Sequence, residues 1–190
     1  MNRRGVAVFA GAALLLLAGC TSADGLAGES GTGGYISGDG TVLIIPAADR
    51  GESIAYAGDT VEGDHVDSAT LSGVVVLNFW YAGCPPCRLE SPDLEAVHQK
   101  YLDNVTFVGV NTRDSAPTAK SFETTYGVSY DSILDVTTRD VLSAFAENVP
   151  PAAVPTTLVL DAKGRVAARI SGQLPSQTTL ADILDAVLAE

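Results

Sequence analysis

Two cysteines three positions apart are the residues best suited to chemistry in this sequence. Cys84 and Cys87 are separated only by Pro85 and Pro86. A disulfide between them would close a very short loop, and the stabilisation gained by closing a loop grows with its length. The spacing therefore favours reversible oxidation and reduction over structural cross-linking.

The segments around these cysteines predict how their sulfurs are positioned. Val74 to Trp80 is apolar apart from Asn78, as in a buried parallel strand, and a short loop leads to a helix that begins at Pro85. Unpaired N–H groups and a partial positive charge at a helix N-terminus favour a thiolate over a thiol. We therefore expect Cys84 to be an exposed, ionised nucleophile. Cys87, one turn later, would resolve the mixed disulfide.

The third cysteine, Cys20, ends an apolar run. Arg3 and Arg4 precede the run Val6 to Leu17, which is too short to span a bilayer comfortably. The segment Leu17-Ala18-Gly19-Cys20 resembles the bacterial lipoprotein signal, in which the cysteine is lipidated and becomes the new N-terminus. The alternative is an ordinary secretory signal. Both interpretations place the protein outside the cytoplasm, where disulfides are permitted.

Composition limits the partners of the chain and suggests its domain organisation. Hydrophobic residues make up 46% of the sequence and the net charge is −12, which predicts a folded core with an acidic surface. Such a surface repels nucleic acid and anionic lipid headgroups, so membrane contact is expected only through the lipid anchor. We predict a signal peptide over residues 1–19, a tether rich in Gly, Ser and Thr over residues 20–50, and one domain over residues 51–190.

Apolar periodicity predicts the remaining elements. Besides Val74 to Trp80, strands are expected at residues 42–45, 105–110, 156–160 and 166–170. The last two would form a hairpin through the turn Asp161 to Gly164. Helices are expected at residues 85–101, 115–126, 137–146 and 176–188, with Ser176 capping the last. This order predicts an α/β fold with a central mixed sheet and helices on both faces.

Several motifs resemble one protein family. The segment Asn78 to Cys87 resembles the active-site segment of the thioredoxin superfamily. Cys87-Arg88-Leu89-Glu90-Ser91-Pro92, Val108 to Asn111 and Val154-Pro155-Thr156-Thr157 resemble its TlpA/ResA-like branch of bacterial thiol–disulfide oxidoreductases. The resemblance covers roughly residues 51–190 and implies a thioredoxin-like fold.

The resemblance assigns a substrate-binding role to three residues. Pro155 would follow a cis peptide bond beside the cysteines, leaving the Val154 backbone free to pair with an extended substrate peptide. The alternative is a trans proline in an ordinary loop. Trp80 would shield the site, although an aromatic residue at a strand end is often simply part of the core.

The resemblance also points to an acid–base group. Glu90 lies three residues after Cys87, near the same helical face. If partly buried, its pKa would rise and it would exchange protons with Cys87. The alternative is a solvated surface acid. Asn78 stands where thioredoxin has a buried Asp, which leaves Glu90 as the acid–base candidate.

The function implied is disulfide reduction in exported proteins, notably the CxxCH segment of apocytochrome c. A membrane electron carrier of the CcdA/DsbD type would restore the dithiol. No cofactor beyond the Cys84–Cys87 disulfide is expected, and the isolated His65 and His98 make a poor metal site. Two alternatives are an oxidase that donates its disulfide to exported proteins and a peptide-binding lipoprotein without catalytic activity.

Overall fold

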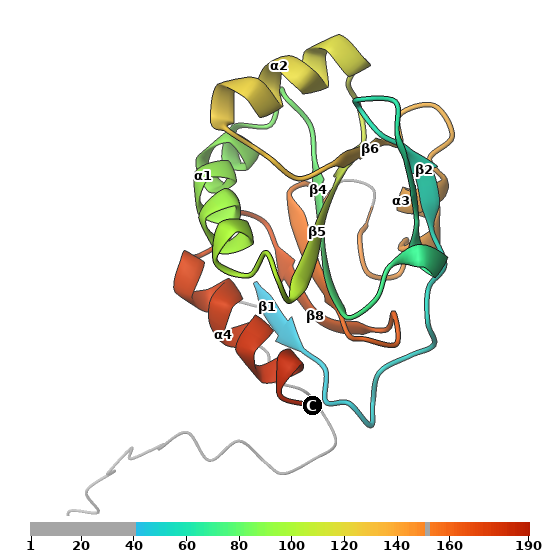
Figure 1. Ribbon diagram of the computed structural model, residues 1–190, viewed down its shortest axis with the longest axis vertical. Coiled ribbons are helices and arrows are strands. Elements are labelled where there is room, and N and C mark those ends of the chain that lie inside the picture. Colours follow the sequence, from blue (N-terminus) through green and yellow to red (C-terminus); the bar gives the residue numbers. More distant parts are fainter. Residues whose placement is uncertain (1–40, 151–152) are drawn as a thin grey trace, which may run out of the picture. The chain divides into compact units, whose positions relative to one another are not determined.

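A mixed six-stranded sheet forms the centre of the fold in the computed structural model, which describes residues 41–150 and 153–190 (Figure 1). The strand order is β1-β8-β7-β4-β5-β6. The strands span Val42–Ile44 (β1), Val166–Ser171 (β8), Thr156–Leu160 (β7), Val74–Trp80 (β4), Val105–Asn111 (β5) and Ser132–Leu134 (β6). Because β4 pairs parallel with β5 and antiparallel with β7, the predicted mixed sheet is confirmed. Cys20 and the predicted signal peptide lie outside the described residues.

Helices cover both faces of the sheet, as predicted. The helices α1 (Pro85–Lys100), α2 (Ala116–Tyr126) and α4 (Gln177–Leu188) lie on one face (Figure 1). The short helix α3 (Asp140–Ala144) and a two-stranded sheet of β2 (Ala57–Asp59) and β3 (His65–Asp67) lie on the other. Neighbouring residues of β4 point to opposite faces, so Val76 packs toward α1 and α4 while Leu77 packs in the opposite cluster. None of the described helices is both long enough and apolar enough to cross a bilayer.

The register of the sheet aligns the strand ends that meet near the cysteines. Val42 lies opposite Ile170, Ile170 lies opposite Thr157, and Thr157 lies opposite Asn78. This row crosses β1, β8, β7 and β4. It runs close to the end of β4, from which a short loop leads into α1.

Helix ends follow the local sequence signals. Ser176 caps α4 by accepting a hydrogen bond from the Thr179 N–H at 3.1 Å, as predicted. Gly127 ends α2 in the left-handed conformation with φ 70°, which glycine adopts without steric cost. Helix α1 continues through Pro92 and buries an inward stripe of Cys87, Glu90, Ser91, Leu94 and Val97.

Some short elements differ from the prediction. β6, β2 and β3 have three residues each and, unlike the equally short β1, are not uniformly apolar, and the sequence analysis did not predict them. Helix α3 covers Asp140–Ala144 rather than residues 137–146. Arg139, the N-cap, has a positive φ of 58°, which lies outside the α-helical region, so the helix begins only after it.

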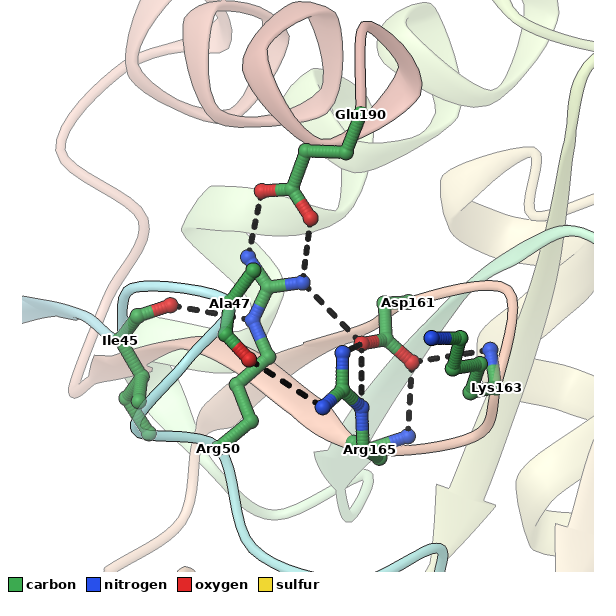
Figure 2. Close-up of polar contacts among 7 residues, drawn as sticks. All are labelled: Ile45, Ala47, Arg50, Asp161, Lys163, Arg165 and Glu190. Atoms are coloured by element: carbon green, nitrogen blue, oxygen red, sulfur yellow. Dashed lines mark hydrogen bonds and ion pairs between the residues drawn. The ribbon is translucent and has the colours of Figure 1, made fainter.

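A buried ion-pair network lies at the turn that joins β7 to β8 (Figure 2). The Arg50 guanidinium contacts Asp161 at 3.0 Å and both carboxylate oxygens of Glu190 at 2.6 Å, and its Nε–H donates to the Ile45 carbonyl. Burial acts to raise the pKa of Asp161, but hydrogen bonds from Arg165 and Arg50 outweigh it and hold the pKa at about 2.

The network also corrects the predicted domain boundary. Because β1 is part of the sheet and the Arg50 side chain is buried, the folded part includes residues 42–50. The sequence analysis placed these residues in the tether and began the domain at residue 51. The strand predicted at residues 42–45 is present, but its partner β8 and the partners of Arg50 are distant in the chain, so local composition did not show that the segment belongs to the domain.

Candidate active site

Cys84 and Cys87 form a disulfide where the chain passes from β4 to α1. Cys84 is the N-cap of α1, and its sulfur accepts a hydrogen bond from the Cys87 N–H at 3.2 Å. This amide belongs to the first turn of the helix, where N–H groups have no intrahelical partner. The arrangement favours negative charge on the Cys84 sulfur once the disulfide is reduced.

The prediction that Cys84 is exposed is wrong. Both cysteines are only 1% exposed, in a cluster with Trp80, Ala119 and Phe122. The reason is tertiary packing, because α2 and the segment before β7 place apolar groups against the disulfide. A partner can reach the Cys84 sulfur only by displacing part of this cover.

Trp80 lies in that cluster and is held from two sides. Its ring stacks on Phe122 of α2 with centroids 4.4 Å apart, and its Nε1–H donates to the Ser132 hydroxyl at 3.3 Å. Trp80 is therefore a core residue that also encloses the cysteines, so the two interpretations of its role are compatible.

Val154 and Pro155 lie beside the disulfide. The peptide bond between them is cis, and the Val154 carbonyl oxygen is 4.0 Å from the Cys84 sulfur. Because a disulfide sulfur carries no hydrogen, this approach is a contact rather than a hydrogen bond. The Pro155 carbonyl accepts from the Gly172 N–H at 2.9 Å, which fixes the segment against the end of β8.

Glu90 is buried on the inward face of α1, in the same stripe as Cys87. Its side chain accepts hydrogen bonds from the Asn78 Nδ2–H at 2.9 Å and from the Leu174 backbone N–H at 2.8 Å. Burial raises the pKa of Glu90 to about 7, and the two hydrogen bonds only partly oppose this shift. Glu90 is therefore able to gain or lose a proton near neutral pH.

Asn78, Thr157 and Leu174 are site residues that sequence reasoning did not assign. The Asn78 amide donates both to Glu90 and to the Thr157 hydroxyl, the latter at 3.1 Å. A single polar residue inside an apolar strand is a usable signal for such a partner. Leu174 contributes only its backbone N–H from 84 positions away, so its side-chain type gives no signal.

The loop before Cys84 is fixed by polar side chains. The Asp114 carboxylate accepts from the Ala82 N–H at 2.6 Å, and the Arg88 Nε–H donates to the Ala82 carbonyl at 2.9 Å. The loop backbone is thus hydrogen-bonded to α1 on one side and to the segment after β5 on the other. In the described parts of the chain, no three His, Cys, Asp or Glu side chains are grouped as metal ligands.

Comparison with known proteins gives related sequences. The profile of the Redoxin family matches residues 47–187. The thiol:disulfide interchange protein HelX of Rhodobacter capsulatus is 31% identical over 129 residues, covering 67% of this chain and 69% of HelX. The thiol-disulfide oxidoreductase ResA of Halalkalibacterium halodurans is 27% identical over 128 residues, covering 66% of this chain and 70% of ResA.

Solved structures with similar folds also exist. A DsbF homologue from Corynebacterium diphtheriae superimposes with a TM-score of 0.70 and 34% identity, covering 82% of this chain and 99% of its own. A secreted thiol-disulfide isomerase from Corynebacterium glutamicum gives a TM-score of 0.72 and 30% identity, covering 83% of this chain and 98% of its own.

Proposed function

The chain belongs to the Redoxin family, as a TlpA/ResA-like thiol–disulfide oxidoreductase with a thioredoxin-like fold, and from this premise we propose that it reduces disulfides in exported proteins. Cys84, Cys87 and Glu90 would carry the exchange. The observation that supports this most is the placement of a buried Glu90, with a pKa of about 7, on the same helical stripe as Cys87.

The proposed reaction balances as a two-electron exchange. The Cys84 thiolate attacks one sulfur of the substrate disulfide, forming a mixed disulfide and releasing the other substrate sulfur as a thiolate. Cys87 gives its proton to the Glu90 carboxylate and then attacks the Cys84 sulfur. This step forms the Cys84–Cys87 disulfide and releases the second substrate thiolate, so the substrate is reduced and the protein is oxidised.

The pKa of Glu90 suits this role. A general base is most effective when its pKa lies near the working pH. A carboxylate with an ordinary pKa near 4.5 would be a weak base toward a thiol, whereas one with a pKa of about 7 is a far better match. The Cys87 N–H that points at the Cys84 sulfur supports the complementary role of Cys84 as the thiolate.

We propose that exchange takes place on the outer face of the bacterial cell membrane. Lipidation of Cys20 would anchor the chain, and a membrane electron carrier of the CcdA/DsbD type would return it to the dithiol. Exported proteins with disulfides, apocytochrome c among them, would be the substrates. A Cys20→Ala variant released into the medium supports the anchor, and a wild-type Cys20 that carries no lipid by mass spectrometry contradicts it.

The reduction potential of the Cys84–Cys87 pair tests the proposed direction. A reductase should have a potential near that of thioredoxin, about −270 mV, whereas a strong oxidant has about −120 mV. This difference of roughly 150 mV corresponds to about 7 kcal/mol in the dithiol–disulfide equilibrium. A potential at the oxidising end would contradict the reductase assignment while leaving the exchange chemistry intact.

An oxidase or isomerase is the second candidate. One of the similar solved structures is described as a secreted thiol-disulfide isomerase and another as a DsbF homologue. If the oxidised protein promotes correct folding of a reduced, unfolded substrate while the reduced protein fails to reduce a native disulfide, this second function replaces the first.

The third candidate function is that of a peptide-binding protein without catalytic activity. It predicts that Cys84→Ser leaves the cellular function unchanged. Loss of function in that single variant, at unchanged protein level, removes this alternative.

A further inference from the structure

The chain is acidic overall, but the surface near the loop before Cys84 carries positive charge. The chain has 23 acidic and 11 basic residues. A groove of about 470 Å³ between α1 and α2 is nevertheless lined by polar, apolar and aromatic residues, and Arg88 is the one charged side chain among its described lining residues. Neither cysteine lines the groove, but it includes Ala82, which belongs to the loop that leads to Cys84.

A second cation reaches the same loop from the other side. The Arg113 guanidinium lies over the ring of Tyr81 at 4.2 Å from its centroid. The Tyr81 ring in turn lies against Gly83, the residue before Cys84. Arg88 and Arg113 therefore approach the loop Tyr81–Gly83 from α1 and from the segment after β5.

Both arginines are exposed, and neither forms an ion pair within the described residues. Asp114 follows Arg113 in the chain, and its Oδ2 already accepts hydrogen bonds from the Ala82 N–H and the Asn111 side chain. Leu89, next to Arg88, is 66% exposed and adds apolar surface. An exposed cationic and apolar rim on an acidic protein suits a partner of opposite charge.

We propose that Arg88 and Arg113 bind a carboxylate-bearing segment that flanks the cystine of the substrate. This inference deepens the proposed dithiol exchange and rests on it. Acidic side chains near the substrate cystine would be held over the loop Tyr81–Gly83, which brings the cystine toward Cys84. Basic segments would be disfavoured at the same place by like-charge repulsion.

Peptides with one internal cystine and Glu, Gln or Lys flanking it test this proposal. The reduced protein is mixed with each peptide at pH 7, and thiol trapping gives the second-order rate constant for its oxidation. We expect the Glu peptide to react faster than the Gln peptide, and the Lys peptide slowest, with differences that shrink as salt is added. Equal rates for all three peptides would overturn the inference. If no peptide oxidised the protein, the proposed exchange itself would fail.

Variants assign the effect to the two arginines. In Arg88→Gln and Arg113→Gln, we expect the Glu-to-Gln rate ratio to fall by about twofold to fivefold each, as for exposed charge pairs. Arg88→Lys keeps the charge and should retain most of the preference. Lys163→Gln, which removes a charge from the turn after β7, should leave the ratio unchanged.

The Glu-to-Gln rate ratio is the informative quantity. A change in the thiolate fraction of Cys84 alters the rates with both peptides by the same factor, so it does not change their ratio. A ratio that stays at the wild-type value in both Arg→Gln variants would contradict the assignment.

Discussion

Two carboxylates are buried at opposite ends of β7, in opposite electrostatic environments. Glu90 is 1% exposed and is linked to the start of β7 through Asn78 and Thr157; among the residues that the structure describes, it accepts hydrogen bonds only from uncharged amides. Asp161 follows the end of β7, is 6% exposed, and is paired with Arg50 and Arg165. Burial pushes both pKa values upward, to about 7 for Glu90, but hydrogen bonds from the Arg165 backbone and from the Arg165 and Arg50 side chains lower that of Asp161 to about 2.

The difference separates a reactive carboxyl group from a structural one. Asp161 remains charged at every pH near neutrality, so it holds the β7–β8 turn to Arg50 in the segment after β1, and Arg50 in turn contacts Glu190. Glu90 changes its protonation state close to neutral pH, which is useful for proton transfer and unfavourable for stability. Four measurements test this division.

The largest expected effect is on the exchange rate of Glu90→Gln. Glutamine cannot accept the Cys87 proton, so we expect the rate at pH 7 to fall by about 10²- to 10⁴-fold, the usual contribution of a general base. Stopped-flow oxidation of the reduced protein by a cystine peptide measures it. Glu95→Gln, the same change later in α1, is the matched control and should react like the wild type. A Glu90→Gln rate within twofold of wild type would assign the carboxyl group no part in proton transfer.

Asp161→Ala should affect stability and leave the chemistry unchanged. It leaves Arg50 buried beside Glu190 alone, and breaking a buried ion pair costs about 3–5 kcal/mol. Urea unfolding measures the loss, and the exchange rate at low temperature should match the wild type. Asp59→Ala removes an exposed pair with His65 and should cost under about 1 kcal/mol. If both variants lost a comparable free energy of unfolding, burial would not increase the contribution of the Asp161 ion pair to stability.

The two carboxylates should give stability curves of opposite slope with pH. The pKa of Glu90 is raised from 4.5 to about 7, so its contribution is complete below pH 4.5 and about 3 kcal/mol is lost as the pH rises through 7. The pKa of Asp161 is lowered from 3.8 to about 2, so its contribution is complete above pH 3.8 and about 2 kcal/mol is lost as the pH falls toward 2. Urea unfolding of the oxidised protein across this range measures both.

Each slope has its own control variant. Glu90→Gln should abolish the loss between pH 4.5 and 7 and retain the loss at acid pH. Asp161→Ala should abolish the loss of stability at acid pH and retain the loss between pH 4.5 and 7. A wild-type curve that is flat between pH 5 and 8 would mean that the Glu90 pKa is not raised.

The smallest expected effect is a shift in a pH profile. Asn78→Asp replaces a hydrogen-bond donor to Glu90 with a second carboxyl group, and both changes disfavour a charged Glu90. We expect the midpoint of the exchange rate against pH to rise by about 1–2 units, as for loss of a hydrogen bond to a charged group. Thr157→Val removes the other acceptor of Asn78 and should leave the midpoint in place. An unmoved midpoint in Asn78→Asp would rule out Asn78 as a positioning residue.

Long, strongly patterned segments were predictable from the sequence. The apolar run of β4, broken only by Asn78, the proline at the start of α1 and the residues Gly127 and Ser176 at helix ends carry local signals, and the structure has these elements at nearly the predicted positions. The three-residue strands β2 and β3 pair with each other but contain no apolar run, and β6 pairs with β5, which lies earlier in the chain, so none of them carries such a signal. The role of Arg50 was missed for the same reason, since its partners Asp161 and Glu190 are over 100 positions away.

The site was predictable where residue type dictates chemistry. The spacing predicted the Cys84–Cys87 pair, and the family resemblance implied the cis peptide before Pro155; of the two positions left open for Glu90, the structure has the buried one. The burial of Cys84 was not foreseen, because it arises from packing by α2 and the segment before β7 rather than from the sequence around the cysteine.

The register across the sheet has a consequence for how an anchored molecule would be oriented. The row of Val42, Ile170, Thr157 and Asn78 shows that the chain enters β1 at the same end of the sheet as the disulfide. With β1 three strands from β4, the point of entry lies roughly 14 Å to the side of β4. If Cys20 carries the proposed lipid, the anchored segment would therefore join the sheet at the end where the disulfide lies.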